Sequence, residues 1–143
     1  MDYPITAAAA AAVLLILQQV LMLTVGITRG KRGLGVGDGD DPDMLRKIRR
    51  HGNLAENAAI FVVTLALLEM LAGAGAGLTI LAALFVGARV LHAIGFSNLA
   101  GSHGGEHKGP KLYPAARAVG ATLTALTGIA AGGWLGVALS GVV

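Results

Sequence analysis

The sequence contains no cysteine and few aromatic or charged residues. Of its 143 residues, 4% are aromatic and 13% are charged. Without cysteine there is no disulfide framework, no thiolate nucleophile and no thiolate metal site, so any thiol chemistry must use a thiol from another molecule. Apolar residues dominate instead, with 55% of the residues hydrophobic and a mean hydropathy of +0.70. These values exceed those of a water-soluble domain of this size, so we expect lipid to be the solvent.

Four apolar segments follow one another along the chain, and each is long enough to cross about 30 Å of hydrocarbon as a helix. They predict an all-α membrane protein, a four-helix bundle in a single domain over residues 1–143, with helices at about 5–28, 44–71, 78–97 and 115–141. Asp43, beside Pro42, is the expected N-cap of the second helix. A signal peptide is the alternative for the first segment, but the segment opens with Asp2 instead of a basic region and its apolar run is too long.

Lysine and arginine gather beside two of the connecting loops and are absent from the tract between the second and third segments. By the positive-inside rule, loops 29–44 and 98–114 are expected in the cytoplasm and both termini on the opposite side. The formal net charge of +3 and the pI of about 9.7 would also suit a nucleic-acid partner. However, the basic residues flank apolar segments and no aromatic platform accompanies them, so we expect a lipid bilayer and no nucleic acid.

The second segment carries Arg49, Asn53 and Glu56 at offsets of four and three residues. This spacing places the three side chains on one helical stripe near the membrane surface, where they can face one ligand together. An ionisable side chain inside a span is expensive unless it is paired or faces a wet cavity, so Glu56 indicates function. The alternative is a Glu56–Arg89 pair that only fixes the register of the bundle, with Arg46 to Arg50 serving as topology-setting charges.

The third segment brings a cation, an imidazole and an aromatic ring to one face, because Arg89, His92 and Phe96 recur at helical spacing. This face predicts a site inside the bundle, although a hydrogen-bonded core histidine explains His92 alone better than a catalytic base does. Arg117, in the first turn of the fourth segment, would meet the Arg49 end of the second segment and help to form a pocket for an anion. The alternative for Arg117 is a positive-inside anchor.

No metal site is predicted. His103 and His107 stand four residues apart with Glu106 beside them, but two glycines lie between the histidines. Because glycine disfavours the helix that would hold both imidazoles on one face, we expect a solvated loop. Glu69, near the outer end of the second segment, is expected to reach the membrane interface without a functional role.

The stretch RKIRRHGNLAENAAIF resembles the second-helix signature of the MAPEG family, the membrane-associated proteins in eicosanoid and glutathione metabolism. The matching residues are Arg49, His51, Asn53 and Glu56. The stretch GARVLHAIG, with Arg89 and His92, is similar to the family's third helix, and PAARAVG is similar to the start of its fourth. The resemblance covers nearly the whole chain and indicates a bacterial-type member similar to microsomal glutathione transferase and prostaglandin E synthase.

The resemblance implies a homotrimer in the bacterial inner membrane, with sites between neighbouring subunits that open to the cytoplasm and to the bilayer. Glutathione would be the co-substrate, bound in a folded shape by Arg49, Asn53, Glu56, Arg89 and His92. Arg49 would hold a carboxylate and Glu56 the ammonium group. Arg117 would stabilise the glutathione thiolate, because a nearby guanidinium lowers the pKa of a thiol. The implied activity is a glutathione transferase or peroxidase acting on lipophilic small molecules that are electrophiles.

The chain departs from the family pattern at three places. Ala58 stands where a larger or aromatic residue is frequent, Ala59 replaces a frequent proline, and the third helix has Phe96 but no tyrosine. These departures leave a second function open, a non-catalytic membrane subunit or scaffold that keeps the family fold and binds a lipid or another thiol. A small transporter has little support, because neither broken spans nor an inverted repeat is present.

Overall fold

The computed structural model describes residues 3–102 and 109–141. In this part of the chain five helices follow one another, and their bounds are α1 Ile5–Arg32, α2 Pro42–Ala72, α3 Ala76–Gly95, α4 Leu99–Ser102 and α5 Leu112–Ser140. The four long helices α1, α2, α3 and α5 of these described residues are long and apolar enough to cross a membrane. The predicted all-α fold with four spanning helices is therefore confirmed.

The outward faces of the long helices are apolar. Ile16 on α1, Ile80 on α3 and Ile129 on α5 are 67%, 59% and 73% exposed. In water such a surface would drive association, whereas in a bilayer it faces hydrocarbon. The chain is therefore an integral, multi-pass membrane protein that is embedded in a lipid bilayer.

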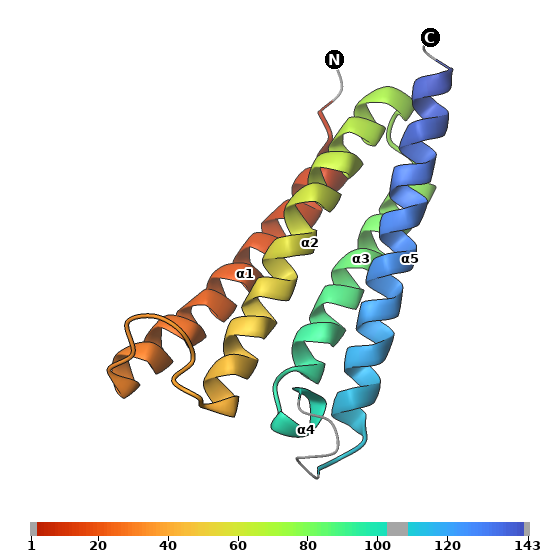
Figure 1. Cartoon of the computed structure of the whole chain (residues 1–143). Helices are drawn as coiled ribbons and strands as arrows, with labels where there is room; N and C mark the ends of the chain where they lie inside the picture. The colour runs from red at the N-terminus through yellow and green to blue at the C-terminus, as the bar shows by residue number, and fades with distance from the viewer. Residues whose placement is uncertain (1–2, 103–108, 142–143) are drawn as a thin grey trace.

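The long helices pack as two pairs, in which α1 lies along α2 and α3 lies along α5 (Figure 1). Contacts of α2 with α5 and of α1 with α3 join the two pairs. The start of α1 and the end of α5 lie at one end of the bundle, whereas α4 and the loop between α1 and α2 lie at the other (Figure 1). This placement is the one expected if both termini share one side of the membrane. Which side is cytoplasmic stays a prediction.

The first pair is held by matching apolar stripes. On α2 the buried residues recur at offsets of four and three, and they are Leu54, Ala58, Phe61, Leu65 and Leu68. On α1 the buried stripe has the same period and includes Ala7, Ala10, Leu14 and Leu21. A repeat of 3.5 residues keeps two such stripes facing each other along their length, as in a coiled coil. The α1–α2 pair therefore buries a continuous seam.

The second pair is held by a close approach of two helix backbones. A Cβ atom added at Gly120 of α5 would lie 2.6 Å from the backbone nitrogen of His92 and 2.7 Å from the carbonyl oxygen of Ala88, both on α3. A Cβ at Gly95 of α3 would likewise overlap the backbone of Arg117 on α5. Small residues permit this contact between spanning helices, where lipid supplies no hydrophobic drive for association. Glycine is thus needed at both positions.

The first helix is longer than expected, because α1 continues through Arg32 instead of ending near residue 28. Its last turn is rich in lysine and arginine, which interact favourably with the negative end of the helix dipole. Gly33 then ends the helix with a positive φ of 66°, and the N–H of Leu34 donates to the carbonyl of Arg29. The first residues of the predicted loop 29–44 therefore form the end of the helix.

The second and fourth spans also begin earlier than expected. Asp41, not Asp43, is the N-cap of α2, since its carboxylate accepts from the backbone N–H of Asp43 at 2.8 Å and of Met44 at 3.2 Å. Pro42 then occupies the first helical position, where its missing N–H has no partner to lose. In α5 the helix starts at Leu112, so Pro114 falls within the first turn and is tolerated there.

Glu69 differs from its expected place at the membrane interface, because it is only 5% exposed. Its carboxylate accepts hydrogen bonds from the backbone N–H groups of Thr6 at 3.0 Å and Ala7 at 2.9 Å. The start of α1 has no side-chain cap of its own. Glu69 of α2 therefore caps α1 from across the first helix pair, where a negative charge also suits the helix dipole.

The Glu69→Ala substitution is expected to lower the free energy of unfolding by about 1–2 kcal/mol, because it removes the acceptor for two helix N–H groups. Titration with sodium dodecyl sulfate in mixed micelles, followed by circular dichroism, measures this change. Met70→Ala is the control, since Met70 is the next residue and is 61% exposed. Equal stability of the Glu69→Ala and Met70→Ala proteins would show that the cap contributes nothing.

Candidate functional site

A polar cavity of about 330 Å³ lies between α2, α3 and α5 at the end of the bundle that carries α4. It is lined by Leu45, Arg46, Arg49, Asn53, His92, Phe96, Ser102, Arg117 and Ala121. The lining holds three guanidinium groups and, within the described residues, no carboxylate. Guanidinium groups gathered around a cavity favour a bound anion, especially one with carboxylates.

Three contacts hold the guanidinium of Arg117 in place in the cavity wall. Its Nη1 donates to the carbonyl oxygens of Gly101 at 3.0 Å and Ser102 at 3.1 Å. Its central carbon lies 4.4 Å from the centroid of the Phe96 ring, which gives a cation–π contact. Because the side chain is already oriented, a bound anion would meet a preorganised charge.

Two further arginines of α2 join the helix pairs near this cavity. Arg46 is 8% exposed, and its Nη1 donates to the carbonyl oxygen of Phe96 at 2.5 Å. Arg50 donates from Nε to the carbonyl of Ala93 at 2.7 Å. These carbonyls belong to the last turn of α3 and its cap, whose acceptors lack partners within the helix. Arg46 and Arg50 thus do more than set topology, because they cap α3 from α2.

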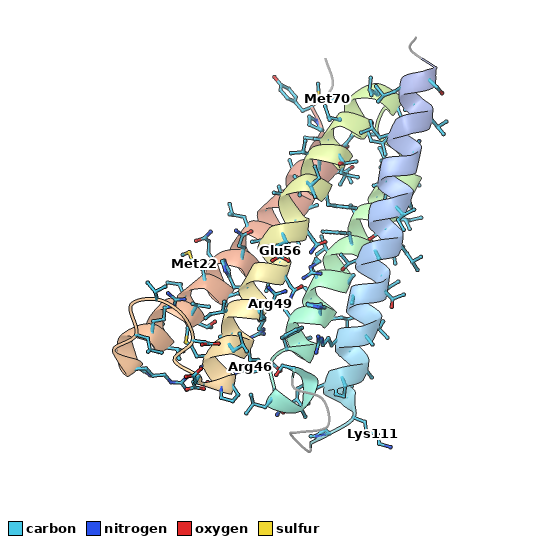
Figure 2. The ribbon with its side chains drawn as sticks, in the orientation of Figure 1. Met22, Arg46, Arg49, Glu56, Met70 and Lys111 are labelled. Carbon is cyan, nitrogen blue, oxygen red and sulfur yellow. The ribbon has the colours of Figure 1, made fainter. Side chains whose placement is uncertain are left out.

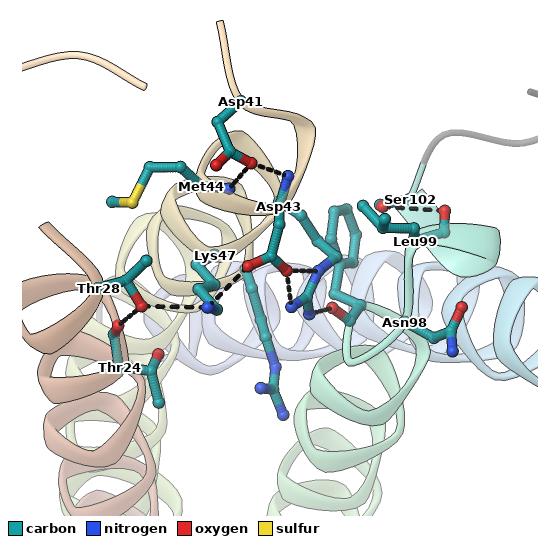
Figure 3. A network of polar contacts seen from close by, with 12 residues as sticks. Thr24, Thr28, Asp41, Asp43, Met44, Lys47, Asn98, Leu99 and Ser102 are labelled. Atoms are coloured by element: carbon teal, nitrogen blue, oxygen red, sulfur yellow. Dashed lines mark hydrogen bonds and ion pairs between the residues drawn. The ribbon is translucent and has the colours of Figure 1, made fainter. Parts of the chain in front are cut away.

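An acidic network at the start of α2 balances part of this positive charge. Asp43 pairs with Arg46 at 2.5 Å, with Lys47 at 2.8 Å and with Arg32 at 3.3 Å. Figure 3 shows Asp43 bonded to Lys47, which also donates to the hydroxyl of Thr28 on α1 at 3.0 Å. The network holds Arg46 beside the cavity and ties the ends of α1 and α2 together. Arg49 and Arg117 are not members of this network.

The structure reproduces the predicted stripe on α2, but the carboxylate of Glu56 is not part of the cavity wall. Figure 2 shows Arg46, Arg49 and Glu56 along one stretch of α2. Arg49 and Glu56 approach each other to 3.9 Å, and their side chains are 55% and 57% exposed. Asn53 donates from Nδ2 to the carbonyl of Arg49 at 2.8 Å, which leaves its side-chain oxygen free to accept. Glu56 therefore pairs with Arg49 of its own helix.

Arg89 and His92 form the deeper part of the site. Arg89 is 3% exposed, and its Nη1 donates to the hydroxyl of Thr124 on α5 at 3.1 Å. Its Nη2 lies 3.4 Å from Nδ1 of His92. Because a guanidinium can only donate, a hydrogen bond between these two atoms requires the His92 tautomer that carries its proton on Nε2. The Nε of Arg89 is buried without a hydrogen-bond partner in the described residues.

A second cavity of about 210 Å³ continues from the first toward these residues. Its lining comprises Asn53, Asn57, Arg89, His92, Ala121, Thr124 and Ala125. Asn53, His92 and Ala121 line both cavities, so the two are parts of one crevice. Arg89 thus lines the deeper part of this crevice, while its Nε is enclosed by protein.

The six residues predicted for the site lie close together in the structure. Arg49, Asn53, His92 and Arg117 line the first cavity, Arg89 lines the second, and Glu56 stands beside Arg49. Glu56 lies 3.9 Å from Arg49, and its charge also acts on Arg89, so the alternative in which Glu56 and Arg89 fix the register of the bundle stays a prediction. The chemical roles of the six residues stay predictions.

The lining residues that the site prediction left out include Arg46, Asn57 and Thr124. Arg46 precedes Arg49 by three positions and Asn57 follows Asn53 by four, so both continue the stripe on α2 at helical spacing. That spacing would have identified them. Thr124 gave no signal, because its role depends on α5 packing against the Arg89 face of α3.

Within residues 3–102 and 109–141, no group of three or more histidine, aspartate or glutamate side chains gathers as metal ligands would. His103, Glu106 and His107, for which we expect a solvated loop, lie outside the described residues. That expectation stays a prediction.

Four spanning helices with an arginine-lined crevice at one end of the bundle define a small polytopic membrane protein. The MAPEG family matches residues 7–137, which is nearly the whole chain. The protein belongs to the MAPEG family, the membrane-associated proteins in eicosanoid and glutathione metabolism. Neither a curated protein nor a solved structure gives a significant match to the chain.

Proposed function

We propose that the protein binds glutathione in the first cavity and transfers it, as the thiolate, to lipophilic electrophiles that enter from the bilayer. The observation that carries this proposal is the cavity with three guanidinium groups, an amide and an imidazole in its wall and no carboxylate in its described lining. Glutathione carries two carboxylates and, once deprotonated, a thiolate. A cluster of guanidinium groups is complementary to all three anionic groups.

The chain offers a partner for each group of the tripeptide. Arg49 and Arg46 are placed to hold carboxylates, and Asn53 can bond a peptide group. Glu56, beside Arg49, suits the ammonium group. Arg117 is the proposed catalytic residue, because its guanidinium is oriented before the ligand arrives and would stabilise the thiolate.

In the transferase reaction, the thiolate sulfur forms a bond to the electrophilic carbon while the leaving group departs with its electron pair. The thiol proton passes to solvent. In the peroxidase reaction, a hydroperoxide is reduced to the alcohol while two glutathione molecules are oxidised to the disulfide, with water as the second product. Both reactions need a thiolate held near the bilayer, and the chain has no cysteine to supply one.

We also propose a homotrimer, with the site open to the cytoplasm of a bacterial inner membrane. Support for an oligomer comes from Arg49 and Glu56, which are more than half exposed on one chain although α2 is a spanning helix. Charged side chains in such a helix favour a protein partner over lipid. A neighbouring copy would cover this surface and complete the wall around the glutathione.

Calorimetric titration of glutathione into the detergent-purified protein tests the proposal. Arg49→Ala and Glu56→Gln should each weaken binding by about 10- to 100-fold, the effect of losing a charge-assisted hydrogen bond. Lys111→Ala is the matched control, because Lys111 is exposed and does not line the cavity. Absence of saturable binding at millimolar glutathione would contradict the proposal and favour a non-catalytic membrane subunit.

A further inference from the structure

One carboxylate, that of Asp43, contacts the arginines of the site without lining the first cavity. Asp43 lies at the start of α2, where Figure 3 shows it within the polar network. Its Oδ1 accepts from Nε of Arg46 at 3.2 Å and from Nη2 of the same side chain at 2.5 Å. Its Oδ2 pairs with Lys47 at 2.8 Å and with Arg32 at 3.3 Å. Because both oxygens are held by cations of α1 and α2, Asp43 fixes the position of the Arg46 guanidinium.

Arg46 carries this constraint from α2 to the end of α3. Its remaining nitrogen, Nη1, donates to the carbonyl oxygen of Phe96 at 2.5 Å, so all three nitrogens of the guanidinium are bonded. The residue is 8% exposed, and close packing leaves it little room for another rotamer. Because a guanidinium is planar and rigid, bonds on two of its edges fix the separation of their acceptors. Arg46 thus holds the Phe96 backbone at a set distance from Asp43.

Phe96 connects Arg46 to the other guanidinium of the cavity wall. Its carbonyl is bonded to Arg46, whereas the centroid of its buried ring lies 4.4 Å from the central guanidinium carbon of Arg117. Gly95, the residue before it, packs against the backbone of Arg117, since a Cβ added there would overlap that backbone. A shift of the end of α3 would therefore move the ring on which the Arg117 guanidinium rests.

We infer that Asp43 is a positioning residue for the stabilisation of the thiolate by Arg117. It acts through the two residues described above, Arg46 and Phe96. This inference rests on the proposed function, in which glutathione binds in the first cavity as the thiolate. A preorganised charge loses much of its effect when it is displaced by about 1 Å, so a residue that fixes its support contributes to the rate without touching the substrate.

The sign of the change in the thiol pKa separates positioning from a direct effect of charge. Asp43→Asn removes a negative charge beside an arginine-lined cavity. By charge alone, this removal would lower the pKa of the bound thiol, because the thiolate loses a repulsive neighbour. Loss of positioning has the opposite effect, since a displaced Arg117 stabilises the thiolate less. We therefore expect the pKa of the bound thiol to rise in the Asp43→Asn protein.

Thiolate absorbance at saturating glutathione, followed against pH, measures this pKa. In the Asp43→Asn protein the midpoint should rise by about one pH unit, and kcat with a chlorodinitrobenzene at neutral pH should fall about tenfold. KM for glutathione should change little, because Asp43 does not line the cavity. A midpoint that stays unchanged or falls would overturn the inference.

Asp40→Asn is the matched control, because it removes the same charge from the loop before α2. Asp40 is exposed, and its φ of 57° is one that asparagine adopts readily. This variant should not raise the midpoint. An equal rise in the Asp40→Asn and Asp43→Asn proteins would show that the contact of Asp43 with Arg46 is not the cause.

Arg46→Lys tests the same path without changing any charge, and it serves even if the Asp43→Asn protein does not fold. A lysine can still pair with Asp43, but it lacks the planar group that joins Asp43 to the carbonyl of Phe96. Direct electrostatics then predict no change in the thiol pKa, whereas loss of positioning predicts a rise. An unchanged midpoint in the Arg46→Lys protein would contradict the inference.

Combining two substitutions tests whether Asp43 acts through Arg117. In the Arg117→Ala background, Asp43→Asn should cause no further loss of kcat, because no guanidinium remains to be positioned. Effects that simply add would show that Asp43 acts elsewhere and would refute the inference.

The failures of the two proposals are distinguishable. If the unaltered protein binds no glutathione or shows no thiolate band, the proposed function fails and the positioning role fails with it. If the unaltered protein shows a thiolate band that depends on Arg117 but not on Asp43, only the positioning role is refuted.

Discussion

Replacing Arg117 by alanine is expected to slow glutathione transfer to a chlorodinitrobenzene by about 10²-fold, with the loss in kcat and only a small change in KM for glutathione. The guanidinium is oriented by the carbonyls of Gly101 and Ser102 and by the Phe96 ring, so it stabilises an anion without reorganising. Removing one preorganised donor of this kind costs about 10²–10³-fold in rate. Arg49 and Glu56 would still hold the tripeptide.

The pH profile separates this role from a structural one. Without the guanidinium, the pKa of the bound thiol rises, so the rate of the Arg117→Ala protein should reach its plateau at higher pH. Arg117→Lys should recover part of the rate, because the charge remains while the planar contact with Phe96 is lost. Lys111→Ala should match the unaltered enzyme. An Arg117→Ala protein with unchanged kcat and pH profile would place thiolate stabilisation elsewhere.

Gly120→Ala is expected to lower the free energy of unfolding by about 1–3 kcal/mol, the usual effect of forcing extra atoms into a packed contact. The new Cβ would lie 2.6 Å from the nitrogen of His92, and neither helix backbone can move without separating α3 from α5. Because His92 and Arg117 stand on these two helices, glutathione binding should weaken as well. Unfolding in mixed micelles and calorimetry measure the two effects.

A second glycine on α5 provides a control in which the expected change in the free energy of unfolding has the opposite sign. A Cβ at Gly136 meets nothing within 4 Å, so Gly136→Ala should raise stability by about 0.5–1 kcal/mol through its better helix propensity. Glutathione binding should not change in this variant. Destabilisation of equal size in both variants would show that the close approach of α3 and α5 at Gly120 is not what makes glycine necessary.

The spans were predictable because long apolar runs in lipid leave few alternatives to a helix. The ends of the helices were not, since local chemistry fixes them. The run from Arg29 to Arg32 could be a loop or a helix end, and Gly33 with its positive φ decides between them. Asp41 and Asp43 are both good caps in sequence, but it is Asp41 that accepts from the backbone N–H groups of the first turn, whereas Asp43 pairs with the side chains of Arg46 and Lys47.

The candidate site was predictable within a helix and less so between helices. Helical spacing alone places Arg49 and Asn53 on one stripe, and it would have added Asn57. What periodicity cannot supply is the partner across the bundle. The contact of Glu69 with the start of α1 and that of Arg89 with Thr124 both depend on packing between distant segments. Glu69 therefore looked like an interfacial residue although it is a buried cap.

The most direct test of the account is the ultraviolet absorbance of the thiolate when glutathione is titrated into the protein at neutral pH. We predict a saturable thiolate band in the unaltered protein that is lost or strongly reduced in the Arg117→Ala protein and kept in the Lys111→Ala protein. Saturable glutathione binding without a thiolate band, or a band that does not depend on Arg117, would contradict the claim that this arginine-lined cavity activates the thiol.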